Sequence, residues 1–239
     1  MSEVASARPT LKRIGWLTKL VTWAAATALL YHRMRIEGAE NLPASGPALL
    51  LPKHRAYRDI LVEGVVLYRL LGRYGNFVMK VGLYGVLEWV GGVKIVRPKD
   101  IRRIKSRQAR RAHIEWARQR NRETLDYLSW IYERGELVVS HPEGQRYEDT
   151  MGALQREVID HLLASEEQLG IEIPVVPIGL EYASMSRPRA ELYVRVGEPV
   201  YASSFDGVEA LMEHVDSAIR RLSGFVEDSA DAPSLKPQV

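Results

Sequence analysis

Short apolar runs alternate along the chain with longer segments in which apolar residues recur at helical spacing. The runs that read as strands are 34–38, 48–51, 76–81, 93–96, 136–140, 171–181 and 190–196. The segments that read as helices are 59–71, 83–90, 106–133, 151–169 and 208–222. This alternation predicts an α/β fold with a mainly parallel central sheet flanked by helices. Sites in such sheets lie at the carboxyl ends of the strands, so polar residues that directly follow strands are the candidate site residues.

The length of 239 residues suits one large domain with short appendages. We expect a tail and an interfacial membrane-anchor helix over 1–32, with disorder in the first ten residues. An α/β domain is expected over 33–224, with a basic helical insertion at about 98–134. The polar residues 225–239 are expected to form a disordered tail.

The N-terminal segment contains an uncharged run of twelve residues, from Leu20 to Tyr31. That run is too short to cross a bilayer, which needs roughly 20 apolar residues. A secretory signal peptide is disfavoured because the run continues past its alanines without a cleavage site. Trp16 and Trp23 lie two helical turns apart and basic residues flank the run, which favours an amphipathic interfacial helix. A helix packed on the domain's own core is the alternative.

Positive charge is concentrated in residues 97–122. This segment contains eleven Lys and Arg and two acidic residues, Asp100 and Glu115, so its net charge is +9. The remainder of the chain carries 22 basic and 28 acidic residues, a net charge of −6. Such a concentration indicates an anionic partner: membrane lipid, nucleic acid or an acidic protein. We expect an anionic membrane surface and no nucleic acid, because the tract lacks aromatic stacking positions and no known nucleic-acid-binding motif is present.

The chain contains no cysteine, which excludes disulfides, thiolate catalysis and cysteine-based zinc sites. This composition fits a reducing compartment. The six histidines are scattered without a ligand-like spacing, so no metal is expected.

Polar clusters follow four of the predicted strands. His54 and Asp59 lie at a strand-to-helix junction, where a carboxylate can orient an imidazole that takes a proton from an alcohol. Lys80, Arg97 and Arg146 supply cations at three strand ends, which suits a phosphate monoester. Glu143 and Gly144 place a carboxylate beside a turn, and the run 173–178 offers an apolar wall suited to an acyl chain.

Taken in order, these blocks resemble the glycerolipid acyltransferase family, the 1-acyl-glycerol-3-phosphate acyltransferases and their relatives. The family pattern contains H-x4-D, G-x5-R, F-P-E-G-T-R and V-P-x-V-P blocks. Their counterparts here are 54–59, 91–97, 141–146 and 173–178. The resemblance spans roughly 35–200, most of the chain, and the P-E-G core is intact.

The resemblance implies that His54 is the general base on the acceptor hydroxyl and that Asp59 holds and polarises it. It implies that Arg97 and Arg146 bind the acceptor phosphate, with Lys80 as a helper. The donor would be acyl-CoA or acyl-carrier protein and the acceptor a lysophospholipid, with no cofactor. The reaction would take place at the cytoplasmic face of the membrane, on a peripheral or monotopic enzyme.

The same resemblance implies that Glu143 and Gly144 shape the acceptor pocket and that Pro177 lines the acyl side. Three positions depart from the family pattern: Lys53 before the histidine, and His141 and Gln145 on either side of P-E-G. His141 either contacts substrate or fills the space of the usual aromatic residue. Because of these departures, another lysophospholipid remains an alternative acceptor. Two alternatives belong to other classes of function: an inactive relative that only binds lipid, and an anion-binding module that uses the arginine-rich helix.

Overall fold

The structure, a computed structural model, describes residues 11–82, 85–97, 101 and 105–225. The predictions of disorder for the first ten residues and for the C-terminal tail beyond 225 lie outside the described residues.

A seven-stranded sheet forms the centre of the molecule, in the order β1-β7-β6-β2-β5-β3-β4. Its strands are β1 (Arg33–Glu37), β2 (Ala48–Pro52), β3 (Gly75–Lys80), β4 (Gly92–Ile95), β5 (Leu137–Val139), β6 (Val175–Tyr182) and β7 (Glu191–Val196). The β6–β7 pair is antiparallel and the other described pairs are parallel. The predicted mainly parallel sheet is therefore confirmed, with β1 and β4 at its two edges.

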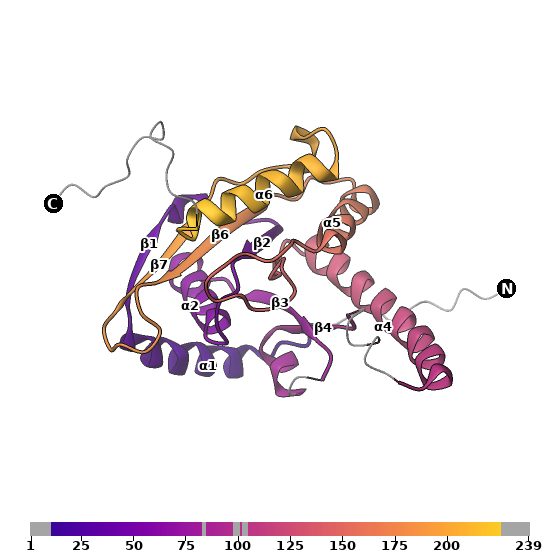
Figure 1. Cartoon of the computed structure of the whole chain (residues 1–239), viewed down its shortest axis with the longest axis horizontal. Coiled ribbons are helices and arrows are strands. Elements are labelled where there is room, and N and C mark those ends of the chain that lie inside the picture. The colour runs from indigo at the N-terminus through magenta and orange to yellow at the C-terminus, as the bar shows by residue number, and fades with distance from the viewer. Residues whose placement is uncertain (1–10, 83–84, 98–100, 102–104, 226–239) are drawn as a thin grey trace.

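Helices cover both faces of this sheet (Figure 1). They are α1 (Gly15–Ala28), α2 (Asp59–Leu71), α4 (Arg107–Glu133), α5 (Arg156–Leu169) and α6 (Val208–Leu222). Short 3-10 segments are η1 (Leu29–Tyr31), η2 (Ala39–Asn41), η3 (Gly85–Val90) and η4 (Ala202–Ser204). Core residues of α1 and α2 pack on one face of the sheet, and those of α4, α5 and α6 pack on the other.

The central strand β2 shows why its sequence is a continuous apolar run. Ala48 and Leu50 face the α1/α2 core, whereas Leu49 and Leu51 face the α4/α5/α6 core. All four side chains are buried, because successive residues of a strand point to opposite faces and both faces are covered. Burial of each leucine stabilises the fold by about 1.5–3 kcal/mol.

Most predicted boundaries are confirmed within one or two residues, but two are wrong. The helix expected from 151 begins at Arg156, because Gly152 donates its N–H to Glu143 Oε1 and Gln155 donates its N–H to Pro142 O. These backbone groups are bound outside a helix, so 151–155 stays extended. The second wrong boundary is the strand expected from 171, which begins at Val175. The short helix expected over 83–90 is present as the 3-10 segment η3, which is described from Gly85 onward.

Apolar spacing within 59–71 predicts a stripe of Ile60, Gly64, Leu67 and Leu71 on α2, with Leu61 and Val65 beside it, and the buried face agrees with this only in part. The buried residues are Asp59, Val62, Glu63, Val65, Val66 and Leu67. The helix is rotated because two carboxylates, Asp59 and Glu63, face inward at the site described below. By contrast, helical spacing predicts one face of α4 that contains Ala117, Asn121, Leu128 and Tyr132. Ala117, Leu128 and Tyr132 are buried there, and Asn121 binds the backbone of Val96.

No helix in the described part of the chain is both long enough and apolar enough to cross a membrane.

Candidate active site

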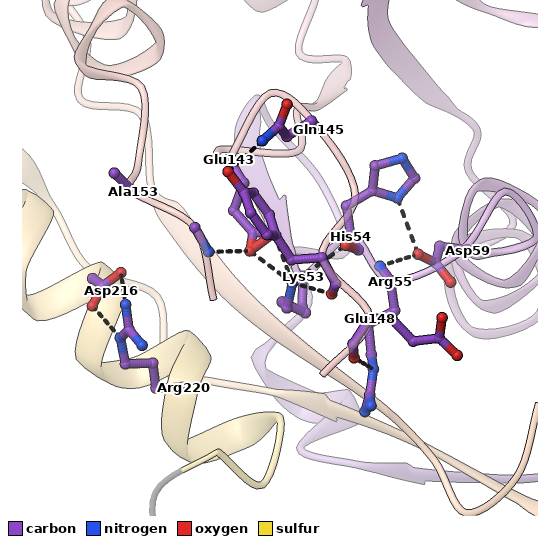
Figure 2. A network of polar contacts seen from close by, with 12 residues as sticks. Lys53, His54, Arg55, Asp59, Glu143, Gln145, Glu148, Ala153, Asp216 and Arg220 are labelled. Carbon is purple, nitrogen blue, oxygen red and sulfur yellow. Dashed lines mark hydrogen bonds and ion pairs between the residues drawn. The ribbon is translucent and has the colours of Figure 1, made fainter. Parts of the chain in front are cut away.

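His54 lies in the short connection between the central strand β2 and the start of α2. His54 Nδ1 is 3.0 Å from Asp59 Oδ2, as Figure 2 shows. The His54 side chain is 12% exposed and that of Asp59 is fully buried. The predicted contact is therefore present, and it uses Nδ1 of the ring. The opposite nitrogen, Nε2, makes no hydrogen bond to another described residue.

Asp59 is held by more than the imidazole. Its Oδ2 accepts hydrogen bonds from the N–H groups of Arg55 and Ala56, each at 2.6 Å, and its Oδ1 accepts from the Tyr182 hydroxyl at 2.7 Å. Burial by itself would raise the pKa of Asp59, but the bonds from His54, Ala56 and Tyr182 outweigh it and lower the pKa. Asp59 is therefore a fixed carboxylate that selects the His54 tautomer with a proton on Nδ1.

The pKa of His54 is lowered from its usual value. Burial is the largest cause, and the positive charges of His141 and Arg146 add to it, whereas Asp59 opposes the shift. A lowered pKa keeps the imidazole neutral near pH 7, the form that accepts a proton.

Lys53, the residue before His54 that departs from the family pattern, is buried and binds Glu143. Its side chain is 0% exposed, and Lys53 Nζ lies 2.7 Å from both carboxylate oxygens of Glu143 (Figure 2). The ammonium also donates to Tyr147 O at 2.8 Å and to His54 O at 3.3 Å. This buried pair ties the loop after β5 to the segment that carries His54, so Glu143 lies at the site as a buried anchor.

A second contact, between Arg97 and the turn after Glu143, links the segment after β4 to the loop after β5. Gly144 adopts φ +64°, a conformation that favours glycine, and its carbonyl accepts a hydrogen bond from Arg97 Nη1 at 2.9 Å. Arg146 is exposed, and its guanidinium carbon lies 3.5 Å from the centre of the Tyr57 ring. Arg97, Gly144 and Arg146 are thus brought to the His54 side of the sheet.

Two predicted residues are placed differently. Lys80 is exposed at the end of β3, beside β4, and forms no ion pair with another described residue. Pro177 is buried within β6, paired with Leu51 and packed near Gly197 and Leu222. Pro177 therefore lies inside the sheet, on the side covered by α6.

Two cavities among the described residues do not include His54 in their lining. The larger, of about 430 Å³, is lined by Val81, Glu88, Lys94, Trp116, Gln119, Arg120 and Glu123 and contains none of the predicted site residues. The smaller is an apolar space between α2 and the sheet, of about 10 Å³.

Sequence reasoning missed Glu63 and Tyr182. Glu63 Oε1 lies 3.0 Å from His141 Nε2, and the His141 ring stacks on His54 with ring centres 3.9 Å apart. A charged residue one turn after Asp59, with apolar residues between and after the two, was the available signal for Glu63. Tyr182 had no local signal, because it reaches Asp59 from 123 positions away.

Comparisons with known proteins identify the family and the fold. A family model described as Acyltransferase matches residues 33–181, more than half of the chain. The crystal structure of the 1-acyl-sn-glycerophosphate (LPA) acyltransferase PlsC from Thermotoga maritima is similar, with a TM-score of 0.54 and 20% sequence identity over 87% of this chain and 78% of that one. At that identity the likeness shows a shared fold. No match was found among curated proteins.

Proposed function

This chain belongs to the acyltransferase family, and from that premise we propose that it acylates 1-acyl-glycerol-3-phosphate to give phosphatidic acid. The donor in this proposal is acyl-CoA or acyl-carrier protein, and no cofactor takes part. The observation that carries the proposal is the His54–Asp59 pair at the end of the central strand, with Arg97 and Arg146 on the same side.

In the proposed mechanism His54 acts as general base. His54 Nε2 takes the proton of the acceptor hydroxyl while the oxygen attacks the thioester carbonyl carbon. The resulting tetrahedral intermediate breaks its C–S bond, and His54 returns the proton to the departing thiolate. Asp59 stabilises the imidazolium that forms between these steps. The acceptor attacks the donor directly, so the enzyme needs no nucleophile of its own.

The acceptor phosphate is assigned to Arg146 and Arg97. Arg146 is exposed near His54 and is oriented by the ring of Tyr57. Arg97 reaches the same loop through its bond to Gly144 O. Guanidinium groups bind phosphate through paired N–H donors. Lys80 is a more distant helper, one that attracts the anion without contacting the loop.

We expect Arg146→Gln to raise the KM for 1-acyl-glycerol-3-phosphate by about tenfold to a hundredfold, the loss of one charge-assisted bond. The KM for the donor should change little. The assay is acyl transfer to a panel of lysolipids with and without a phosphate monoester, using acyl-CoA and acyl-carrier protein as donors. Arg221→Gln, an exposed arginine on α6, is the control.

Equal losses for acceptor and donor would place Arg146 elsewhere. Preference in that panel for a lysophospholipid with a larger headgroup would replace the proposed acceptor and keep the reaction.

We further propose that α1 and η3 attach the enzyme to the cytoplasmic face of the membrane. One face of α1 packs on α2 and buries Thr18 and Ala25, so the alternative of a helix on its own core is correct for that face. The opposite face exposes large apolar residues, and η3, which contacts α1, adds to them. The exposed residues are Trp16 (70%), Leu20 (53%), Trp23 (69%), Val86 (48%) and Trp89 (52%). Exposed tryptophans on one surface are typical of interfacial binding.

The basic half of α4 is proposed to contact anionic headgroups. This helix projects from the body of the molecule in Figure 1, and Arg107, Arg111 and Arg118 are exposed on it. Each basic residue near an anionic surface contributes about 1 kcal/mol.

Vesicle flotation separates these two contributions. Replacing Trp16, Trp23 and Trp89 with serine should weaken binding to neutral and anionic vesicles alike, by at least about tenfold. Replacing Arg107, Arg111 and Arg118 with glutamine should weaken binding to anionic vesicles by about a hundredfold and leave neutral vesicles unaffected. Unchanged binding of the arginine variant to anionic vesicles would remove α4 from the proposal.

A further inference from the structure

A second carboxylate–imidazole pair lies directly against the first. Asp59 and Glu63 are one turn apart on α2, so both carboxylates leave the same face of the helix. Asp59 contacts His54, and Glu63 contacts His141, each at 3.0 Å. The two imidazoles are stacked, with ring centres 3.9 Å apart and planes inclined by 25°. Two adjacent turns of one helix therefore hold two stacked histidine rings.

The second pair is shielded from water. The side chains of His141 and Glu63 are 9% and 4% exposed. Glu63 Oε2 is buried and has no hydrogen-bond partner among the described residues, so the bond to His141 is the interaction that satisfies this carboxylate. A buried carboxylate is stable only with a counter-charge or a proton, and His141 is placed to supply the counter-charge.

The surrounding charges favour a charged His141. Facing it are Glu63 and Asp59 from α2, Glu143 from its own loop, and the His54 ring. Burial alone would lower the pKa of His141, but the three carboxylates raise it, Glu63 most of all. Burial raises the pKa of Glu63, and the charge of His141 opposes that shift. The charge of Glu143 is already neutralised by Lys53. His141 is therefore the residue placed to neutralise Glu63, and this second ion pair lies beside the ionised Asp59.

We propose that His141, held as an imidazolium by Glu63, is a positioning residue that sets a fixed positive charge against the His54 ring and keeps that ring in its free-base form. This deepens the proposed function and rests on it, because a general base must be unprotonated before it reacts. A second positive charge at stacking distance opposes protonation of His54, whereas Asp59 alone would favour it. The groups that face His54 are Asp59, His141 and Arg146. His141 is thus more than a replacement for an aromatic side chain.

The test is an NMR titration of the His54 imidazole in the full-length protein. His141→Phe keeps a stacked ring and removes the charge, and Glu63→Gln keeps the shape and removes the counter-charge. Both should raise the midpoint of His54 protonation by about one pH unit. The double variant should show no larger shift than His141→Phe, because the two residues act as one unit. His214→Gln, at an exposed position on α6, should leave the midpoint unchanged.

Activity gives a second readout of the same proposal. The acidic limb of the pH profile of kcat/KM should move upward by the same amount in both variants, while the rate at alkaline pH changes little. A residue that only packs against His54 would lower the rate at every pH and leave the limb in place.

Each result decides something. A wild-type His54 midpoint in either folded variant overturns the proposal, as does a wild-type spectrum with a neutral His141 at pH 7. The titration does not depend on catalysis, so a shifted midpoint in a protein that fails to acylate lysophosphatidate supports the charge relation and refutes the proposed function.

Discussion

Replacing His54 with alanine should abolish acyl transfer, with a loss of about 10²–10⁴-fold in kcat. In the proposed mechanism the imidazole Nε2 takes the acceptor proton, while Asp59 contacts the opposite ring nitrogen. Without the ring the hydroxyl must lose its proton to water, which is a poorly positioned and weaker base. The measurement is initial rate with saturating donor and acceptor.

His54→Ala should leave the fold intact, since this partly exposed ring lies in a loop at the end of β2 and not in either core. Thermal unfolding is therefore expected within a few degrees of wild type. His113→Ala on α4 is the matched control and should retain activity. Turnover near the wild-type rate in folded His54→Ala would refute the proposed mechanism.

Replacing Lys53 with methionine should destabilise the protein by about 3–5 kcal/mol, because it leaves Glu143 buried without its counter-charge. Lys53 and Glu143 are both fully buried, and two 2.7 Å contacts join them. Small and medium-sized proteins are stable by only about 5–15 kcal/mol, so the loss is a large fraction of the total. The measurement is the free energy of unfolding from urea denaturation.

The double variant Lys53→Met/Glu143→Gln is the informative companion, since it removes both charges. It should recover a substantial part of the loss, because a neutral buried pair costs less than one unpaired charge. The surface pair Arg156–Glu209 offers a matched contrast, and Arg156→Met should leave the free energy of unfolding nearly unchanged, because water screens an exposed ion pair. A loss of similar size in Lys53→Met and Arg156→Met would contradict the assigned role of the buried pair.

Destabilisation by Lys53→Met should also depend on pH. Burial raises the pKa of Glu143 even beside Lys53, and removing the ammonium raises it further. A group with a raised pKa is stabilised in its protonated form, so the cost of the variant is greatest above that pKa and falls as pH decreases through it. Urea denaturation of both proteins at acidic and neutral pH checks the sign.

Local pattern was sufficient for the core elements. The apolar run of β2 and the helical spacing of 59–71 and 208–222 predicted the elements found there. A strand buried on both faces requires consecutive apolar residues, and a helix buried on one face requires apolar residues at helical spacing, so both patterns are visible in the sequence. It failed where backbone groups are bound from elsewhere: the expected start of the helix at 151 was wrong because Glu143 and Pro142 bind the extended segment before α5.

The face of α2 could not be read from its own sequence. Its inward carboxylates, Asp59 and Glu63, are polar residues in positions that a purely apolar stripe would assign to the surface. These carboxylates bind His54, five positions before Asp59, and His141 and Tyr182, which come from distant parts of the chain. A rule based on apolar periodicity cannot detect such compensation.

The sequence by itself determined the fold class, the family and the His54–Asp59 pair, which is a contact between residues five positions apart at one strand end. Only the tertiary structure decided the partners of Lys53 and His141, two of the three residues that depart from the family pattern. Lys53 meets Glu143 across 90 positions, and His141 meets Glu63 across 78. Neighbours along the chain share local geometry that spacing reveals, whereas a buried charge finds its partner through packing of the whole sheet and its helices, so these pairs had to be seen in three dimensions.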